Sequence, residues 1–215
     1  MERASTRKEG EAEKMSGKEQ VHIQLFHKWD TTEIAINDPG LKNVISLKPA
    51  VIPVTFGRHE HKRLKKAEVN IVERLANKMM HFGKKYAKNT GRMGGKKARM
   101  LNIVKTAFEI IHLETGKNPV ELLVRAIENS SPNEDTTRIV YGGVVYHVSV
   151  DVAPLRRVDL ALRFIAEGVR ESTYSSPQAI EEALAKEIIL ASNNDMASHA
   201  VKKKNEQERI AMASR

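Results

Sequence analysis

Residues 137–152 read TRIVYGGVVYHVSVDV, and this stretch decides the fold because it interrupts an otherwise helical pattern. It is rich in β-branched and aromatic residues, and Gly142-Gly143 at its centre is typical of a two-residue hairpin loop with positive φ. The cross-strand pairs expected around that loop are Tyr141 with Val144, Ile139 with Tyr146 and, on the other face, Arg138 with His147. The sequence therefore predicts one two-stranded β-hairpin over residues 137–152.

Helical periodicity dominates the chain on both sides of this hairpin. From about Ala67 onward, apolar residues recur at three- and four-residue spacing, which is the pattern of amphipathic helices. Asn118 followed by Pro119 supplies an N-cap and a first-turn proline for one of them. The expected helices span residues 67–82, 96–114, 119–130, 154–173, 177–192 and 195–212, the last three behind Pro154, Pro177 and Asp195. The predicted fold is mainly α, a bundle of about six helices with one β-hairpin.

The chain before the helices has a different texture. Residues 1–20 hold five acids and five bases with almost nothing apolar, so they cannot bury enough surface to offset the entropy of ordering. We expect a disordered or partner-ordered tail there. Residues 21–57 alternate short apolar runs with turn signals such as Asn37-Asp38-Pro39-Gly40, which predicts an extended N-terminal arm with turns and short strands. Residues 58–215 are expected to form the main helical domain.

The composition limits the classes of protein that the chain can belong to. Its 215 residues carry a net charge of +9, which suits a polyanionic partner. Cysteine is absent, so disulfides and Cys-ligated metal sites are excluded. No apolar run approaches the roughly 18–20 residues that a membrane helix needs, and the charged N-terminus has no signal-peptide core. The sequence predicts a soluble protein that stays in the cell and contacts no membrane.

Basic residues are unusually concentrated in the middle of the chain. No acid lies between Glu73 and Glu109, where the bases are Arg74, Lys78, Lys84, Lys85, Lys88, Arg92, Lys96, Lys97, Arg99 and Lys105. A second basic block just before the first helix contains Arg58, Lys62, Arg63, Lys65 and Lys66. A solvated charged face normally mixes signs, as residues 154–173 do, where internal salt bridges are an open alternative. The acid-free stretch favours phosphate binding.

Two further features have open interpretations. Tyr141 and Tyr146, near the hairpin tip, could stack on unpaired bases while Arg138 contacts a phosphate backbone. The alternative is that both tyrosines pack on the body of the domain, since an isolated two-stranded ribbon has marginal stability. Residues 202–204, KKK, could bind a polyanion or be an ordinary solvated tail.

Signatures of enzymes are poor. Residues 91–97, GRMGGKK, resemble a phosphate-binding loop, but the glycine spacing is one short of GxxxxGK and Lys97 replaces the Ser or Thr that binds magnesium. The GxxG pattern of KH domains occurs there without the surrounding strands. His59 and His61 lack further metal ligands nearby in sequence. We expect no catalytic residues, metal, cofactor or small-molecule substrate. An RNA-modifying or nucleotide-dependent enzyme and a DNA-binding helical module are the alternatives.

Several stretches, in order along the chain, resemble the small-subunit ribosomal protein seven family. They are residues 71–80 (IVERLANKMM), 95–97 (GKK), 107–112 (AFEIIH), 118–119 (NP), 125–129 (RAIEN), 141–143 (YGG), 150–163 (VDVAPLRRVDLALR) and 200–206 (AVKKKNE). Residues 26–30 (FHKWD) and 38–42 (DPGLK) resemble the archaeal and eukaryotic branch, where the eukaryotic counterpart is called protein five. The resemblance covers about residues 22–215 and implies a helical domain with a protruding β-hairpin.

The resemblance also implies a function. Members of this family are structural proteins of the cytoplasmic small ribosomal subunit. They bind the 3′ major domain of its rRNA, nucleate assembly of the head, and lie near the exit-site tRNA, the mRNA path and neighbouring ribosomal proteins. Together with the charge pattern, it gives the residues expected to contact RNA: Arg58, Lys62, Arg63, Lys65, Lys66, Lys84, Lys85, Lys88, Arg92, Lys96, Lys97, Arg99, Arg138, Arg156, Arg157, Arg163, Lys202, Lys203 and Lys204. The hairpin tip expected to point toward the exit-site tRNA consists of Tyr141, Gly142, Gly143, Val144 and Val145.

Overall fold

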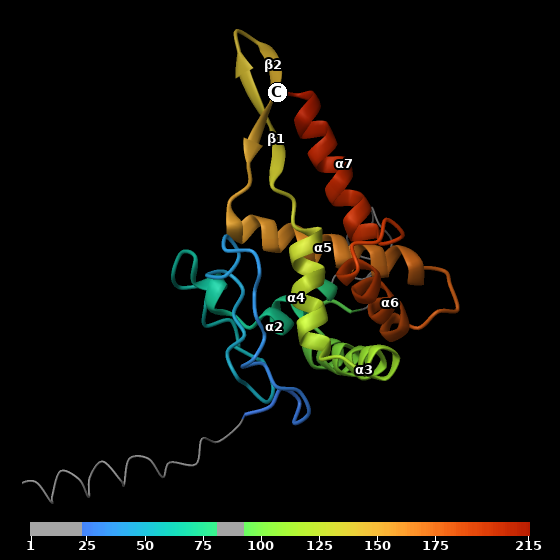
Figure 1. Cartoon of the computed structure of the whole chain (residues 1–215). Coiled ribbons are helices and arrows are strands. Elements are labelled where there is room, and N and C mark those ends of the chain that lie inside the picture. Colours follow the sequence, from blue (N-terminus) through green and yellow to red (C-terminus); the bar gives the residue numbers. More distant parts are fainter. Residues whose placement is uncertain (1–22, 81–92) are drawn as a thin grey trace, which may run out of the picture.

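The fold is mainly α, as predicted, with one hairpin projecting from the helical body (Figure 1). A computed structural model describes residues 23–80 and 93–215. Within these residues there are six α-helices and one two-stranded antiparallel sheet. The elements are the 3-10 helix η2 (Lys65–Glu68), α2 (Ile71–Met79), α3 (Lys97–Thr115), α4 (Pro119–Ser130), β1 (Glu134–Tyr141), β2 (Val144–Asp151), α5 (Pro154–Thr173), α6 (Ile180–Ser192) and α7 (His199–Ala213).

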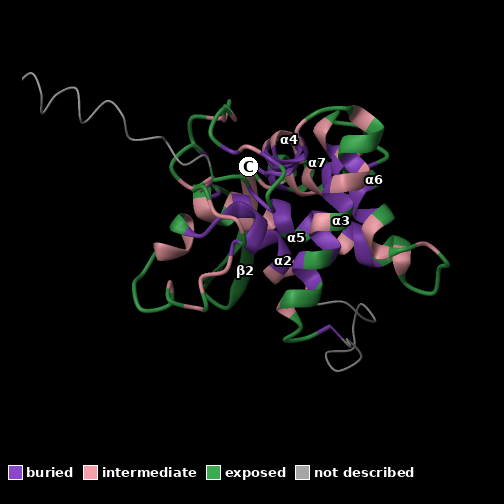
Figure 2. Ribbon diagram, turned by 90° about the horizontal axis from the view of Figure 1, so that it is seen from below, coloured by how far each residue is buried: buried purple, intermediate pink, exposed green. Residues whose placement is uncertain are grey.

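Helices α5 and α6 hold the bundle together, since α2, α4, α6 and α7 pack against α5, and α3, α4, α5 and α7 pack against α6. Figure 2 shows that the buried residues gather where α2, α3 and α5 meet, whereas β2 is exposed. Phe108, Leu123 and Leu162 are among the largest side chains buried there. A Cβ added to Gly168 would lie 2.7 Å from the Cβ of His199. The missing side chain therefore lets α5 and α7 approach closely.

The sequence predicted three helices to within one residue and placed three starts too early. Helix α4 begins as expected, because Asn118 Oδ1 accepts a hydrogen bond from Val120 N at 3.0 Å. The first predicted helix was wrong at residues 67–70, which are not part of α2. Asn70 caps α2, and the 3-10 helix η2 precedes it. The predicted end of this first helix, at residue 82, lies outside the described residues.

The other two wrong starts have the same kind of cause. Ser176 Oγ accepts a hydrogen bond from Gln178 N at 3.3 Å, so the segment around Pro177 is a turn and α6 begins only at residue 180. Asp195 likewise forms a turn, with its side chain accepting from Ala197 N at 2.9 Å. The cap of α7 is Ser198. Short polar side chains make turns as readily as caps, and sequence alone does not separate the two.

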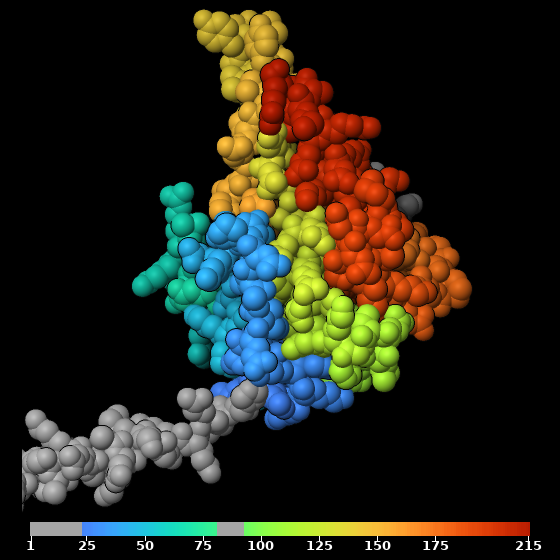
Figure 3. All heavy atoms as spheres, viewed as in Figure 1, coloured from blue at the N-terminus to red at the C-terminus, as the bar shows by residue number. Residues whose placement is uncertain are grey.

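The hairpin has the predicted register, although its strands begin at residue 134 instead of 137. Tyr141 pairs with Val144, Ile139 with Tyr146 and Arg138 with His147. Gly142 and Gly143 have φ values of 58° and 81°, which explains the glycine pair at the loop. The space-filling view in Figure 3 shows the hairpin tip standing clear of the body, with α7 beside its base.

The N-terminal arm packs on the helical core. Leu25, Trp29 and Leu41 are buried, and the Trp29 ring meets Phe108 of α3 edge to face, with centroids 5.8 Å apart. In residues 23–57 the expected short strands are reduced to isolated bridges, such as that between Leu25 and Trp29. The arm is therefore a set of turns that covers one side of the bundle.

Candidate nucleic-acid interface

The two basic segments of the sequence come together in space. Phe56 and Gly57 line a cavity with Lys97 and Ala98, at the start of α3. Phe56 also lines a second cavity with Arg58 and other residues of the segment before α2. The loop before α2 and the first turn of α3 are therefore neighbours, as a shared phosphate-binding surface requires.

Acids that are distant in sequence neutralise part of this charge. The Asp159 carboxylate of α5 lies 2.7 Å from Lys66 Nζ, 3.3 Å from Arg74 Nη2 and 4.0 Å from Lys78 Nζ. Glu73 is buried and forms an ion pair with Lys97. Several bases of the stretch that contains no acid in the sequence therefore have acidic partners in the structure.

Burial and these contacts shift the pKa values of Asp159, Arg74 and Lys78. Burial raises the pKa of Asp159, but the hydrogen bond and charge of Lys66 and the charges of Lys78 and Arg74 outweigh burial, so its pKa lies below the ordinary value. Desolvation lowers the pKa values of Arg74 and Lys78, and Asp159 opposes this. Arg74, only 2% exposed, also donates to Val44 O at 3.0 Å, so it is a structural residue.

The remaining predicted bases of this region are free. Within the described part of the chain, no ion pair or side-chain hydrogen bond engages Arg58, Lys62, Arg63, Lys65, Lys96 or Arg99. We call these six residues the basic surface. All but Lys65 are exposed, and Lys65 is half-buried. They are the groups able to neutralise phosphates without first breaking an internal ion pair. Lys84, Lys85, Lys88 and Arg92 lie outside the described residues.

The predicted arginines of α5 are engaged internally. Arg157, whose side chain is 14% exposed, lies 2.8 Å from the Asp38 carboxylate and thereby ties the arm to α5. Arg156 lies 3.3 Å from Asp135 of β1. Arg163 pairs with Glu167 one turn away, the internal salt bridge that the sequence left open. Arg157 is therefore primarily a residue of the fold, whereas Arg156 and Arg163 keep exposed side chains.

The hairpin presents its aromatic residues to solvent. Tyr141 is 80% exposed and Tyr146 52%, so the alternative in which both pack on the body of the domain is wrong. Arg138 is also exposed on the hairpin, opposite His147. The tip thus offers an aromatic and cationic surface suited to unpaired bases.

The three lysines at 202–204 lie on the first turns of α7, as the predicted helix placed them. Lys203 lies 2.6 Å from Glu206, while Lys202 is exposed. His199, at the start of α7, contacts Glu171 near the end of α5, whereas Lys66 contacts Asp159 near its beginning. The start of α7 and the segment before α2 therefore lie beside different parts of α5.

The described residues contain no group of three or more His, Asp and Glu side chains placed to hold a metal ion. In the same residues, no helix is both long and apolar enough to cross a membrane. One feature that the sequence analysis missed is the cavity beside Phe56. The only sequence signal for it was a pair of apolar residues, Ile52 and Phe56, between prolines and glycine.

Comparison with known proteins shows the family. The sequence matches the family of ribosomal protein S7p/S5e over residues 41–215. The chain is also 67% identical over 197 residues to the small ribosomal subunit protein uS7 of Cenarchaeum symbiosum strain A, covering 92% of this chain and 99% of that relative. The chain therefore belongs to the ribosomal protein S7p/S5e family, which is a family of ribosomal proteins and not of enzymes. This confirms the resemblance drawn from the sequence motifs.

Proposed function

We propose that the chain is a structural protein of the small ribosomal subunit that binds the 3′ major domain of 16S-type rRNA and thereby nucleates assembly of the head. The observation that carries this is the basic surface, whose residues lie in the loop before α2 and at the start of α3 and form no ion pair among the residues that the structure describes. Free Lys and Arg side chains bind phosphates and release counterions. The name of the archaeal relative places that protein in the small subunit, which supports the same location here.

The helices and the hairpin have different roles in this proposal. The basic surface and Lys202 of α7 contact separate parts of the rRNA backbone, so the protein recognises a folded RNA junction by its shape. The exposed hairpin tip points toward the exit-site tRNA and the mRNA path, where Tyr141 is available for stacking. Neighbouring small-subunit proteins are the other partners. The protein needs no cofactor or catalytic residue for this role.

The double variant Lys96→Ala/Arg99→Ala tests the proposal. We expect it to bind a 3′ major-domain rRNA fragment more weakly, and to reduce the slope of log affinity against log salt by up to about 1.4, since each single-stranded phosphate contact contributes about 0.7. Lys97 is left intact because removing its ion pair with buried Glu73 would change the stability of the fold as well as RNA binding. The measurement is a binding titration at several potassium chloride concentrations.

The matched control is Lys117→Ala/Lys186→Ala, which removes the same charge from exposed positions outside the basic surface. If both double variants lost affinity equally, only the net charge would matter and the proposed interface would be wrong. Duplex DNA of equal length serves as competitor. Displacement of the RNA by equimolar duplex DNA would favour a DNA-binding module instead.

A further inference from the structure

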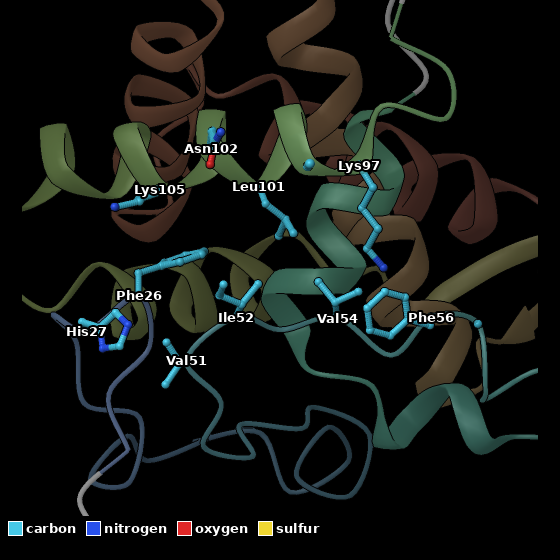
Figure 4. Close-up of a pocket in the computed structure, with 12 residues that line it drawn as sticks. Phe26, His27, Val51, Ile52, Val54, Phe56, Lys97, Leu101, Asn102 and Lys105 are labelled. Carbon is cyan, nitrogen blue, oxygen red and sulfur yellow. The ribbon is translucent and has the colours of Figure 1, made fainter.

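The arm and α3 enclose an apolar cavity of about 640 Å³, which is in the size range of ligand pockets (Figure 4). In Figure 4, Leu101 points from α3 toward Ile52 and Val54 of the arm, while Phe26 closes one end and Phe56 the other. Few of the lining residues are polar, and the charged ones, Lys97 and Lys105, are basic. No acid lines the cavity among the residues that the structure describes.

The backbone around this cavity is held in uncommon conformations. Phe26, His27 and Phe56 have φ values of 53°, 61° and 51°, a region that non-glycine residues rarely adopt, and all three line the cavity. The contacts that hold them are specific: Phe26 N donates to Val51 O at 2.9 Å, and Thr55, beside Phe56, donates through its N and Oγ1 to the buried Glu73 carboxylate at 3.0 and 2.8 Å. Such strain is typical of binding sites.

Phe56 is exposed at a place where a folded chain would normally bury it. Its side chain is 81% exposed, although the apolar cavity lies directly beside it. It also lines a second cavity of about 330 Å³, together with Lys48, Arg58, Lys65 and one acid, Glu68. Lys105 lines the first cavity. An aromatic ring therefore borders an apolar hollow and lies near several cations, which outnumber the one acid.

This combination fits one chemical class of occupant. An apolar peptide would use the hollow but not the surrounding cations, and an anion would use the cations but not the hollow. A nucleotide uses both, because its base stacks on an aromatic ring while its phosphates attract Lys and Arg. We propose that the cavity takes an unpaired base of RNA, stacked on Phe56, with the adjoining phosphates near Arg58 on one side and Lys105 on the other. The inference rests on the proposed rRNA binding and adds to it a contact with an unpaired base.

The test compares Phe56→Ala and Phe56→Trp in the full chain, with a 3′ major-domain rRNA fragment as the probe. Because base stacking on an aromatic side chain is worth about 1–3 kcal/mol, Phe56→Ala should weaken binding about 5- to 160-fold. The salt slope should not change, since no phosphate contact is lost. Phe56→Trp should keep the affinity, and its exposed indole fluorescence should be quenched by the RNA. Leu113→Ala and Leu113→Trp are the controls, because Leu113 is an equally exposed residue of α3 outside the cavity.

The outcomes separate this inference from the proposed function. If the unmodified chain binds the fragment and Phe56→Ala binds equally well, the base pocket is overturned and the rRNA-binding proposal stands. If the unmodified chain does not bind, both fall. A loss of affinity that comes with a smaller salt slope, or with an altered thermal melting curve, would mean that Phe56 acts on the neighbouring cations or the fold and would also overturn the pocket. A change in sedimentation of the free Phe56→Ala chain would identify a second copy as the occupant instead.

Discussion

Asp159 is the residue that joins three cations: Lys66 of η2, and Arg74 and Lys78 of α2. Arg74 is buried, and removing a carboxylate from a buried cation leaves the cation without compensation. The stability of the region between α2 and α5 therefore depends on this carboxylate being ionised.

We predict that Asp159→Asn lowers the free energy of unfolding by about 1.5–3 kcal/mol at neutral pH, the range for hydrogen bonds to charged groups. The pKa of Asp159 is lowered in the folded chain, so its contribution is complete above the ordinary value of 3.8 and is lost as the pH falls through the still lower folded value. The difference in the free energy of unfolding between the variant and the parent should therefore shrink only in strong acid. Denaturant unfolding at several pH values measures it, with Asp151→Asn, an exposed acid of β2, as the control. A difference that did not depend on pH would contradict this account.

At the residue scale, sequence reasoning identified the basic residues and not their partners. Arg74 and Lys78 counted as phosphate-binding charge because no acid lies near them in the sequence. Their partner, Asp159, lies 85 residues from Arg74 and reaches it only because α2 packs against α5. Ion pairs of this kind depend on tertiary packing, for which one sequence carries no local signal.

At the scale of elements, the register of the hairpin was predicted correctly from the sequence. Its register follows from a glycine pair that can adopt positive φ and from the alternation of side chains, and both are local properties. The helix starts were less predictable. Asn118 caps α4, but Ser176 and Asp195 make turns short of α6 and α7, because one side-chain oxygen can serve either purpose.

A shortened hairpin tests the role of its tip. Deleting Val140, Tyr141, Val144 and Val145 removes two residues from each strand and leaves Ile139 paired with Tyr146 across the glycine loop. The deleted side chains are exposed, so we expect the thermal midpoint of the free protein to stay within a few degrees. Small subunits reconstituted with this variant should bind exit-site tRNA more weakly. Unchanged tRNA binding would argue against the proposed position of the tip.

At the scale of the whole molecule, the arm depends on contacts that sequence reasoning did not predict. It was predicted as an extended arm with turns and short strands, and in the structure contacts between distant residues fix its turns to the domain. Glu128 of α4 accepts from Asn37 N at 2.7 Å, and Arg157 of α5 binds Asp38. These contacts span 91 and 119 positions, so the cavity between the arm and α3 could not be foreseen from local patterns.

Among the described residues, free positive charge lies on the basic surface and on α7, and exposed aromatic residues lie at the hairpin tip and beside the arm. Such a distribution suits a partner that surrounds the protein, as a folded RNA does, better than a single groove of a duplex. The excess of positive charge over the whole chain, +9, has the sign this requires.

Chemical footprinting of intact small-subunit rRNA with the full chain tests this account most directly. We expect protection concentrated in the 3′ major domain at moderate salt. The protection should weaken for Lys96→Ala/Arg99→Ala and remain for Lys117→Ala/Lys186→Ala. Protection spread evenly over all rRNA domains, or no protection while the protein remains folded, would contradict it.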